Sequence, residues 1–95
     1  MSKQQYRTDL GIISEILSVT MDRGRQGAII SSIARRANLS HYAVIEKCQK
    51  LIDAKLVETK NNNRNHTYII TEKGVYFFQQ LQKFLETVQE VKIRY

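Results

Sequence analysis

The chain has 95 residues, with 15 Lys and Arg against 9 Asp and Glu, a formal net charge of +6 and one cysteine. This length allows one small domain, and the charge favours a polyanionic partner, nucleic acid before an anionic membrane surface. A single cysteine excludes an internal disulfide and a zinc site of several thiolates. No apolar run reaches the roughly 18 residues of a membrane span, and residues 1–10 lack the apolar segment of a secretory signal. We therefore expect a cytoplasmic protein.

Apolar residues at helical spacing predict three helices in the first half of the chain, and the absence of proline suits them. Residues 1–8 are polar and are expected to form a flexible N-terminus. Thr8 or Asp9 is a suitable cap for the first helix. Asn38 tolerates the left-handed turn that ends the second helix, and Ser40 caps the third. The three helices are expected over about 9–22, 28–37 and 41–54.

Two strands and a long helix are predicted for the second half. Residues 56–59 and 67–70 have strand character, and the asparagine-rich segment between them predicts a hairpin loop. Thr71 caps a helix that runs to about 93 or beyond, about 36 Å in length at 1.5 Å per residue. A small core cannot cover so long a helix, and one of its apolar stripes has the 4-3-4-3-4 spacing of a coiled-coil seam. The residues of this stripe, here called the seam, are Phe77, Leu81, Phe84, Val88, Val91 and Tyr95.

The order helix, helix, helix, strand, strand is that of a winged helix-turn-helix, a mainly α fold with a small β-hairpin. In this fold the third helix enters a major groove, while the second helix and the hairpin, or wing, reach phosphates. We expect a DNA-binding domain over 9–73 and a dimerisation helix over 74–95. The residues expected to contact double-stranded DNA are Ser31, Arg35, Arg36, Ser40, His41, Tyr42, Glu46, Gln49, Lys50, Lys60, Asn63 and Arg64.

Two stretches of the sequence resemble a known family. Gly27–His41 (GAIISSIARRANLSH) and Tyr68–Gly74 (YIITEKG) are similar to the archaeal winged-helix DNA-binding proteins of the small, basic type. The archaellum-regulator-like winged-helix domains share both stretches, and the resemblance covers about residues 9–95. It implies a homodimer in which the long C-terminal helices pair as an antiparallel coiled coil. It also implies binding of duplex DNA, as a nucleoid-associated, chromatin-type protein or as a transcription regulator.

Several of these side chains allow two interpretations. Arg35 and Arg36 could bind phosphates or only solvate the outer face of the second helix. Tyr42 could contact DNA or pack against that helix. Glu46 could accept a hydrogen bond from a cytosine amino group, or it could pair with Lys50 four residues on. An acidic residue on this helix weakens the prediction of strong base readout.

The remaining reactive residue types favour structural roles. Cys48 falls on the buried stripe of the third helix, where a cysteine behaves as a small apolar side chain rather than a reactive thiol. His41 is either a DNA contact or an exposed residue, and His66 is more simply a polar turn residue. The rest of the buried side is expected to be Val44 and Leu51, flanked by Ile45 and Ile52.

Catalysis has little basis in this sequence. It contains no glycine-rich phosphate loop, no paired carboxylates in a predicted cleft and no nucleophile placed beside a base. We expect no enzyme activity, metal, cofactor, membrane partner or small-molecule ligand. The alternative function is a protein–protein interaction module of a larger complex, in which the seam binds a different protein. An RNA or membrane partner would rest on charge alone.

Overall fold

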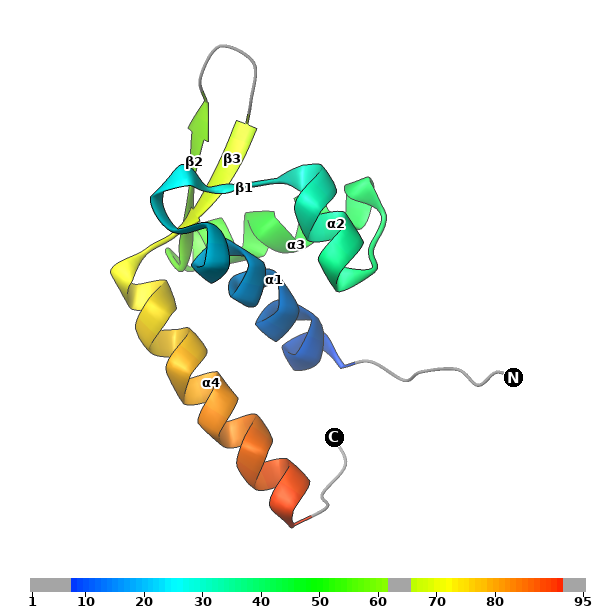
Figure 1. Cartoon of the computed structure of the whole chain (residues 1–95), viewed down its shortest axis with the longest axis vertical. Coiled ribbons are helices and arrows are strands. Elements are labelled where there is room, and N and C mark those ends of the chain that lie inside the picture. The colour runs from blue at the N-terminus through cyan, green and yellow to red at the C-terminus, as the bar shows by residue number, and fades with distance from the viewer. Residues whose placement is uncertain (1–7, 62–65, 92–95) are drawn as a thin grey trace, which may run out of the picture.

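The computed structural model describes residues 8–61 and 66–91. Within them, three helices pack beside a small antiparallel sheet, and a fourth, longer helix leaves this unit (Figure 1). Each strand of the hairpin extends beyond its predicted bounds, and the last helix ends at Glu90 rather than near 93. The elements are α1 (Asp9–Arg23), a short 3-10 turn η1 (Gly24–Gln26), β1 (Ala28–Ile29), α2 (Ile30–Ala37), α3 (His41–Asp53), β2 (Val57–Asn61), β3 (His66–Ile70) and α4 (Glu72–Glu90).

Three hydroxyl side chains begin three of the helices. The side-chain oxygens of Thr8, Ser40 and Thr71 each accept the amide N–H of the residue three positions on, at 3.0, 3.0 and 2.9 Å. These bonds satisfy amides that have no partner inside the helix. Asn38 ends α2 in the left-handed conformation, with φ at 56°. The predicted caps are therefore confirmed, with Thr8 rather than Asp9 capping α1.

The predicted start of the second helix was wrong, because Ala28 and Ile29 form a strand. Ala28 pairs with Tyr68 and Ile29 with Thr67, which makes a three-stranded antiparallel sheet in the order β1-β3-β2. Gly27 sets up this pairing. Its φ of 82° is unfavourable for a residue with a Cβ, and a Cβ there would lie 2.7 Å from that of Thr67. The apolar pattern that predicted a helix here is local, so it could not reveal pairing with residues about forty positions away.

The core lies between α1, α2, α3 and the sheet. Apolar side chains from each of these elements are fully covered, and Cys48 is among them, as predicted. Thr20 is a buried polar residue, and its hydroxyl donates to the Leu17 carbonyl at 2.9 Å. This bond removes the cost of burying an unpaired hydroxyl. The largest fully buried side chains include Ile16, Leu17, Ile33, Val44 and Val57.

The first half of α4 packs on this core, and its second half extends beyond it (Figure 1). Leu81 is buried, and Phe77 and Phe78 pack against the core cluster. On the side facing α1, the Ser14 hydroxyl donates to the side-chain oxygen of Gln82 at 2.9 Å. Beyond this point the helix carries two large apolar residues that are exposed, Phe84 and Val91.

A hydrogen-bonded joint connects the end of α3 to the start of α4; it comprises residues 54–56 and 71–74. Lys55 turns the chain after α3 with φ at 65°, a left-handed position. The Thr71 hydroxyl donates to the Lys55 carbonyl at 2.8 Å, and the Thr71 amide donates to the Leu56 carbonyl at 3.0 Å. The same hydroxyl also caps α4, so one side chain ties the two helices together.

Candidate nucleic-acid interface

The outward side of α3 carries five of the twelve predicted DNA contacts. His41, Glu46 and Lys50 are all exposed there. Ser40 uses its oxygen to cap the helix, which leaves its O–H proton available to a phosphate. The amides of the first helical turn add a partial positive charge at the same end. This end of α3 is therefore chemically suited to an anion.

Gln49 has a partner on its own helix. Its side-chain amide donates to the carboxylate of Asp53 at 3.0 Å, and both residues are exposed. The groups left exposed at this end of the helix are acceptor oxygens of Gln49 and Asp53, and the Asp53 carboxylate carries a negative charge. The C-terminal half of this surface is thus less favourable for phosphate than its N-terminal half.

Two exposed side chains on α3 are large and apolar. Tyr42 is 75% exposed, so it does not pack against α2, and that alternative is settled. Ile45 is 47% exposed, whereas the sequence pattern placed it beside the buried stripe. It lies about 100° around the helix from Val44, which turns it away from the stripe that the core covers.

The ion pairs on α3 differ from the prediction. Neither of the two ion pairs between described residues includes Glu46, so the pair with Lys50 does not form. Lys47 is mostly covered, and its ammonium lies 3.2 Å from a carboxylate oxygen of Asp9 on α1. Of the lysines on this helix, Lys50 alone stays exposed and outside those pairs.

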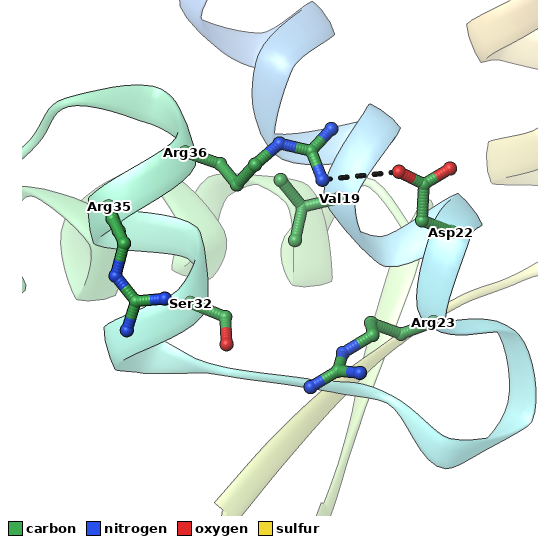
Figure 2. A pocket seen from close by; sticks show the side chains of 6 residues that line it. All are labelled: Val19, Asp22, Arg23, Ser32, Arg35 and Arg36. Atoms are coloured by element: carbon green, nitrogen blue, oxygen red, sulfur yellow. Dashed lines mark hydrogen bonds and ion pairs between the residues drawn. The ribbon is translucent and has the colours of Figure 1, made fainter.

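A cationic hollow of about 330 Å³ lies between the end of α1 and the outer face of α2. Figure 2 shows Arg23, Ser32 and Arg35 around this space, and a dashed line between Arg36 and Asp22. That ion pair joins a guanidinium nitrogen and a carboxylate oxygen at 3.2 Å. The lining residues are Val19, Asp22, Arg23, Ser32, Arg35 and Arg36.

The charges of this hollow suit a phosphate. Three guanidinium groups face one carboxylate, and the carboxylate is already paired with Arg36. Arg35 is exposed, and the predicted contact Ser31 is half-buried one position before Ser32. Guanidinium groups form strong, charge-assisted hydrogen bonds with phosphate oxygens, and a serine hydroxyl can add a further bond. The three guanidinium groups and the Ser32 hydroxyl therefore have the chemistry to hold a phosphate of a duplex backbone.

Arg23 and Ser32 were not among the predicted site residues. Arg23 lies in the last turn of α1, which continues one residue beyond its predicted end at about residue 22. Gly24 forms the C-cap of α1. Ser32 is next to a predicted contact on a two-turn helix, and only the packing of α2 against α1 shows which serine faces the hollow.

The wing is described only in part. Lys60 is exposed near the end of β2, where its ammonium is free to extend from the sheet edge. His66 belongs to β3 rather than to the turn. The predicted contacts Asn63 and Arg64 lie outside the described residues, as does the seam residue Tyr95.

The seam residues divide into two groups. Leu81 is 6% exposed and Phe77 packs against the core, so the chain itself covers much of both side chains. Phe84 is 50% exposed and Val91 is 56% exposed, with Val88 half-buried between them. The apolar surface that remains for a partner is therefore at the far end of α4.

Three further observations concern other kinds of site. Among the described ranges, no three His, Cys, Asp or Glu side chains gather where they could hold a metal ion. Within the same ranges no helix has the length and apolar character needed to cross a bilayer. Burial raises the pKa of the Cys48 thiol to about 12, which makes it a poor nucleophile at neutral pH.

Comparisons with known proteins show which structures this chain is similar to. No curated protein matches the chain. The DNA-binding protein Sso10a-2 from Sulfolobus solfataricus is 20% identical, with a TM-score of 0.78 over 90% of this chain and 86% of that one. AF1382 from Archaeoglobus fulgidus is 25% identical, with a TM-score of 0.70 over 84% and 86%.

A bacterial regulator shares the same fold. A transcriptional regulator of the MarR family from Rhodococcus sp. RHA1 is 14% identical, with a TM-score of 0.78 over 87% of this chain and 59% of that one. The family model described as winged helix-turn-helix matches residues 6–89, which include every described helix and strand up to the last turn of α4. The chain belongs to the winged helix-turn-helix family.

Proposed function

We propose that the chain is a dimeric DNA-binding protein, acting as a nucleoid-associated, chromatin-type protein or as a transcriptional regulator. The observation that carries this proposal is the exposed side of α3 beside α2 and its cationic hollow. An amphipathic helix that is anchored on one face and free on the other is suited to a major groove. The net charge of +6 gives the attraction to the phosphate backbone.

The proposed contacts have different tasks. Arg35, Arg23 and Ser32 would hold a phosphate of the backbone and fix the position of α2. The first turn of α3, with Ser40 and His41, would approach a neighbouring phosphate or base edge. Lys60 and the wing would reach a further phosphate or the minor groove. The reading of base edges would fall to the outward side chains of α3.

The solved relatives support this function. Sso10a-2 is named as a DNA-binding protein, and the structure of ZitR from Lactococcus lactis, 24% identical with a TM-score of 0.65, is a complex with DNA. The chain covers 86% of Sso10a-2 and 63% of ZitR.

The proposed dimer uses α4. Residues 9–73 would form the DNA-binding domain and residues 74–95 the dimerisation helix, paired with a second copy as an antiparallel coiled coil. The exposed surface of Phe84 and Val91 supports this arrangement, because burial of such side chains against an identical helix is favourable. Two DNA-binding domains on one dimer would each bind a half-site.

The test is a fluorescence-anisotropy titration of a labelled random-sequence duplex at several salt concentrations. We expect submicromolar binding at low salt, with log K falling linearly against log salt by about 0.9 for each phosphate contact. Bovine albumin at the same concentration serves as the control for non-specific effects of protein on the probe. A chain that leaves the duplex unbound at low salt would contradict the proposal.

One observation favours a second candidate function. The exposed end of α4 could bind a different protein, which would make the chain an interaction module with a passive wing. Analytical ultracentrifugation of the isolated chain separates the two candidates. A stable homodimer leaves this surface occupied by a second copy, whereas a monomer that also fails to bind DNA supports the interaction module.

A further inference from the structure

Two of the five exposed large apolar side chains in the described ranges are on α3. The other three, Tyr76, Phe84 and Val91, are on α4. Tyr42 and Ile45 are three positions apart, so they are neighbours on one side of the helix. They are 75% and 47% exposed, and neither belongs to the core cluster. The helix proposed to enter the major groove therefore presents a tyrosine ring and a branched aliphatic group to it.

The polar groups of α3 offer few contacts for guanine. The commonest guanine contact is a bidentate arginine or lysine; α3 contains no arginine, and Lys50 is its one exposed lysine. Lys47 is held by Asp9, and Gln49 donates to Asp53. Lys50 is the one exposed cation on the helix, and it lies close in sequence to the carboxylates of Glu46 and Asp53.

The occupant of the apolar pair is argued from charge. Arg35 and Arg23 line the hollow on the adjoining α2 and α1, and Lys60 is exposed on β2. Cations on elements around an apolar pair match a surface that has phosphates at its edges and apolar groups in its floor. The major groove of DNA is such a surface, because the thymine 5-methyl group projects into it.

We propose that Tyr42 and Ile45 contact thymine 5-methyl groups in the major groove and give the protein a preference for A·T pairs. This inference rests on the proposed function and assigns its specificity. Thymine alone of the four bases carries a methyl group in that groove, so an apolar contact there distinguishes it from cytosine at the same position. Ile45 is stiff at χ1 and Tyr42 has two side-chain torsions, so little conformational entropy is lost on contact.

The experiment removes the methyl group without changing base pairing. The full chain is titrated with a labelled A·T-rich duplex and with the same duplex in which every thymidine is replaced by deoxyuridine. The measured quantity is the ratio of the two dissociation constants. We expect the deoxyuridine duplex to bind about fourfold more weakly for each methyl group buried in the complex.

Three variants assign the effect to these side chains. Ile45→Ala and Tyr42→Ala should each bring the ratio closer to one, because the group that contacts the methyl is gone. Tyr76→Ala removes a similarly exposed ring from α4 and should keep the wild-type ratio. Circular dichroism checks that each variant is folded, and Ile45→Ser, which has no methyl group, replaces Ile45→Ala if that variant unfolds.

A reciprocal duplex adds the methyl group to another base. Replacing deoxycytidine by 5-methyldeoxycytidine in a G·C-rich duplex puts a methyl group at the same groove position. Wild type should bind the methylated duplex more tightly, and Ile45→Ala should lose part of that gain. An effect of altered DNA shape would instead persist unchanged in both variants.

The outcomes separate this inference from the proposed function. Tight, salt-dependent DNA binding with a ratio of one would overturn the thymine contact and leave the DNA-binding function in place. A ratio above one that neither Ile45→Ala nor Tyr42→Ala changes would also overturn it, because the effect would then come from DNA shape. Failure of wild type to bind either duplex at low salt would overturn both.

Discussion

Cys48 lies on the inner face of α3 with no exposed surface, and its burial makes the free energy of unfolding depend on pH. Burial raises the pKa of its thiol from 9.0 to about 12. The unfolded chain therefore loses this proton near pH 9, while the folded chain keeps it. We expect the free energy of unfolding to fall as pH rises from about 9 towards 12, by at most about 1.4 kcal/mol per pH unit from this group.

The measurement is urea denaturation at pH values from 7.5 to 10.5. Tyr68 contributes in the same direction, since burial and then the nearby Cys48 raise the pKa of its hydroxyl. Cys48→Ala isolates the thiol, and its free energy of unfolding should depend less on pH over this interval. Equal slopes for wild type and Cys48→Ala would show that the thiol is not the titrating group.

At this scale the sequence predicted what depends on near neighbours. Ser40 and Thr71 cap helices through bonds to residues three positions on, so the pattern is visible in a short stretch. The ion pair of Arg36 with Asp22 joins two helices, and the exposure of Ile45 depends on how α3 rolls against its neighbours. Both features depend on how the helices pack together, and the spacing of residue types along the chain does not predict that packing.

At the scale of elements, α2 presents two arginines that should behave differently. Arg35 has no described ion pair, whereas Arg36 is paired with Asp22. If Arg35 binds a phosphate, Arg35→Gln should weaken binding to all sequences and lower the salt slope by about 0.9. The measurement is the anisotropy titration of a random duplex at four salt concentrations. An unchanged slope would remove Arg35 from the interface.

Asp22→Asn is the matched change in the same hollow. It keeps the shape of the side chain but releases Arg36 from its partner. We expect tighter binding and a steeper salt slope, together with a loss of stability of about 1 kcal/mol at most, because both partners are about half exposed.

The start of α4 allows a second prediction at this scale. A Cβ on Gly74 would overlap the Leu56 carbonyl oxygen, so α4 can pack on the joint only with glycine there. Gly74→Ala should lower the free energy of unfolding by about 2 kcal/mol or more, despite the better helix propensity of alanine. Thermal and urea denaturation followed by circular dichroism give this value.

Gly11 is a matched control for Gly74. Both are the third residue of a helix and both donate their amide to a threonine cap. A Cβ on Gly11 meets only the Thr8 hydroxyl oxygen, at 3.3 Å. Gly11→Ala should therefore change stability by less than about 1 kcal/mol. Similar losses in the two variants would mean that the Leu56 contact is not what restricts position 74.

The elements themselves were predictable to different degrees. The helices and the hairpin follow from apolar spacing, turn residues and caps, all of which are local. The strand β1 is two residues long and exists because it pairs with β3. Its isoleucine continues the apolar stripe of α2, so the local pattern favoured an earlier helix start.

At the scale of the whole molecule, the far end of α4 is where a second copy would bind. Phe84→Glu with Val88→Glu should give a folded monomer, because neither residue belongs to the core cluster and the charges would face each other across the seam. Sedimentation equilibrium gives the mass, and circular dichroism reports the fold. A control pair away from the seam, Gln79→Glu with Gln89→Glu, should leave the mass unchanged.

A double variant that stays dimeric would place the contact elsewhere on the molecule. The sequence predicted that α4 is too long for its core, and the exposure of Phe84 and Val91 agrees with this. It did not predict that Leu81 would be largely covered by the chain's own residues. α1 packs against α4 in this region, where Ser14 bonds to Gln82, and such packing between distant segments is not visible in the spacing of residues.

In the proposed dimer, the joint between α3 and α4 would fix the distance between the two DNA-binding surfaces. Because the carbonyls of Lys55 and Leu56 are bonded to Thr71, the direction of α3 is fixed relative to α4. In a dimer joined through α4, the separation of the two recognition helices is then set by helix length. One residue inserted after Leu81 would turn the partner by about 100° and shift it by about 1.5 Å. Each half of such a dimer would still bind DNA, but the two halves would no longer fit one face of a straight duplex, whose half-sites repeat every 10–10.5 base pairs.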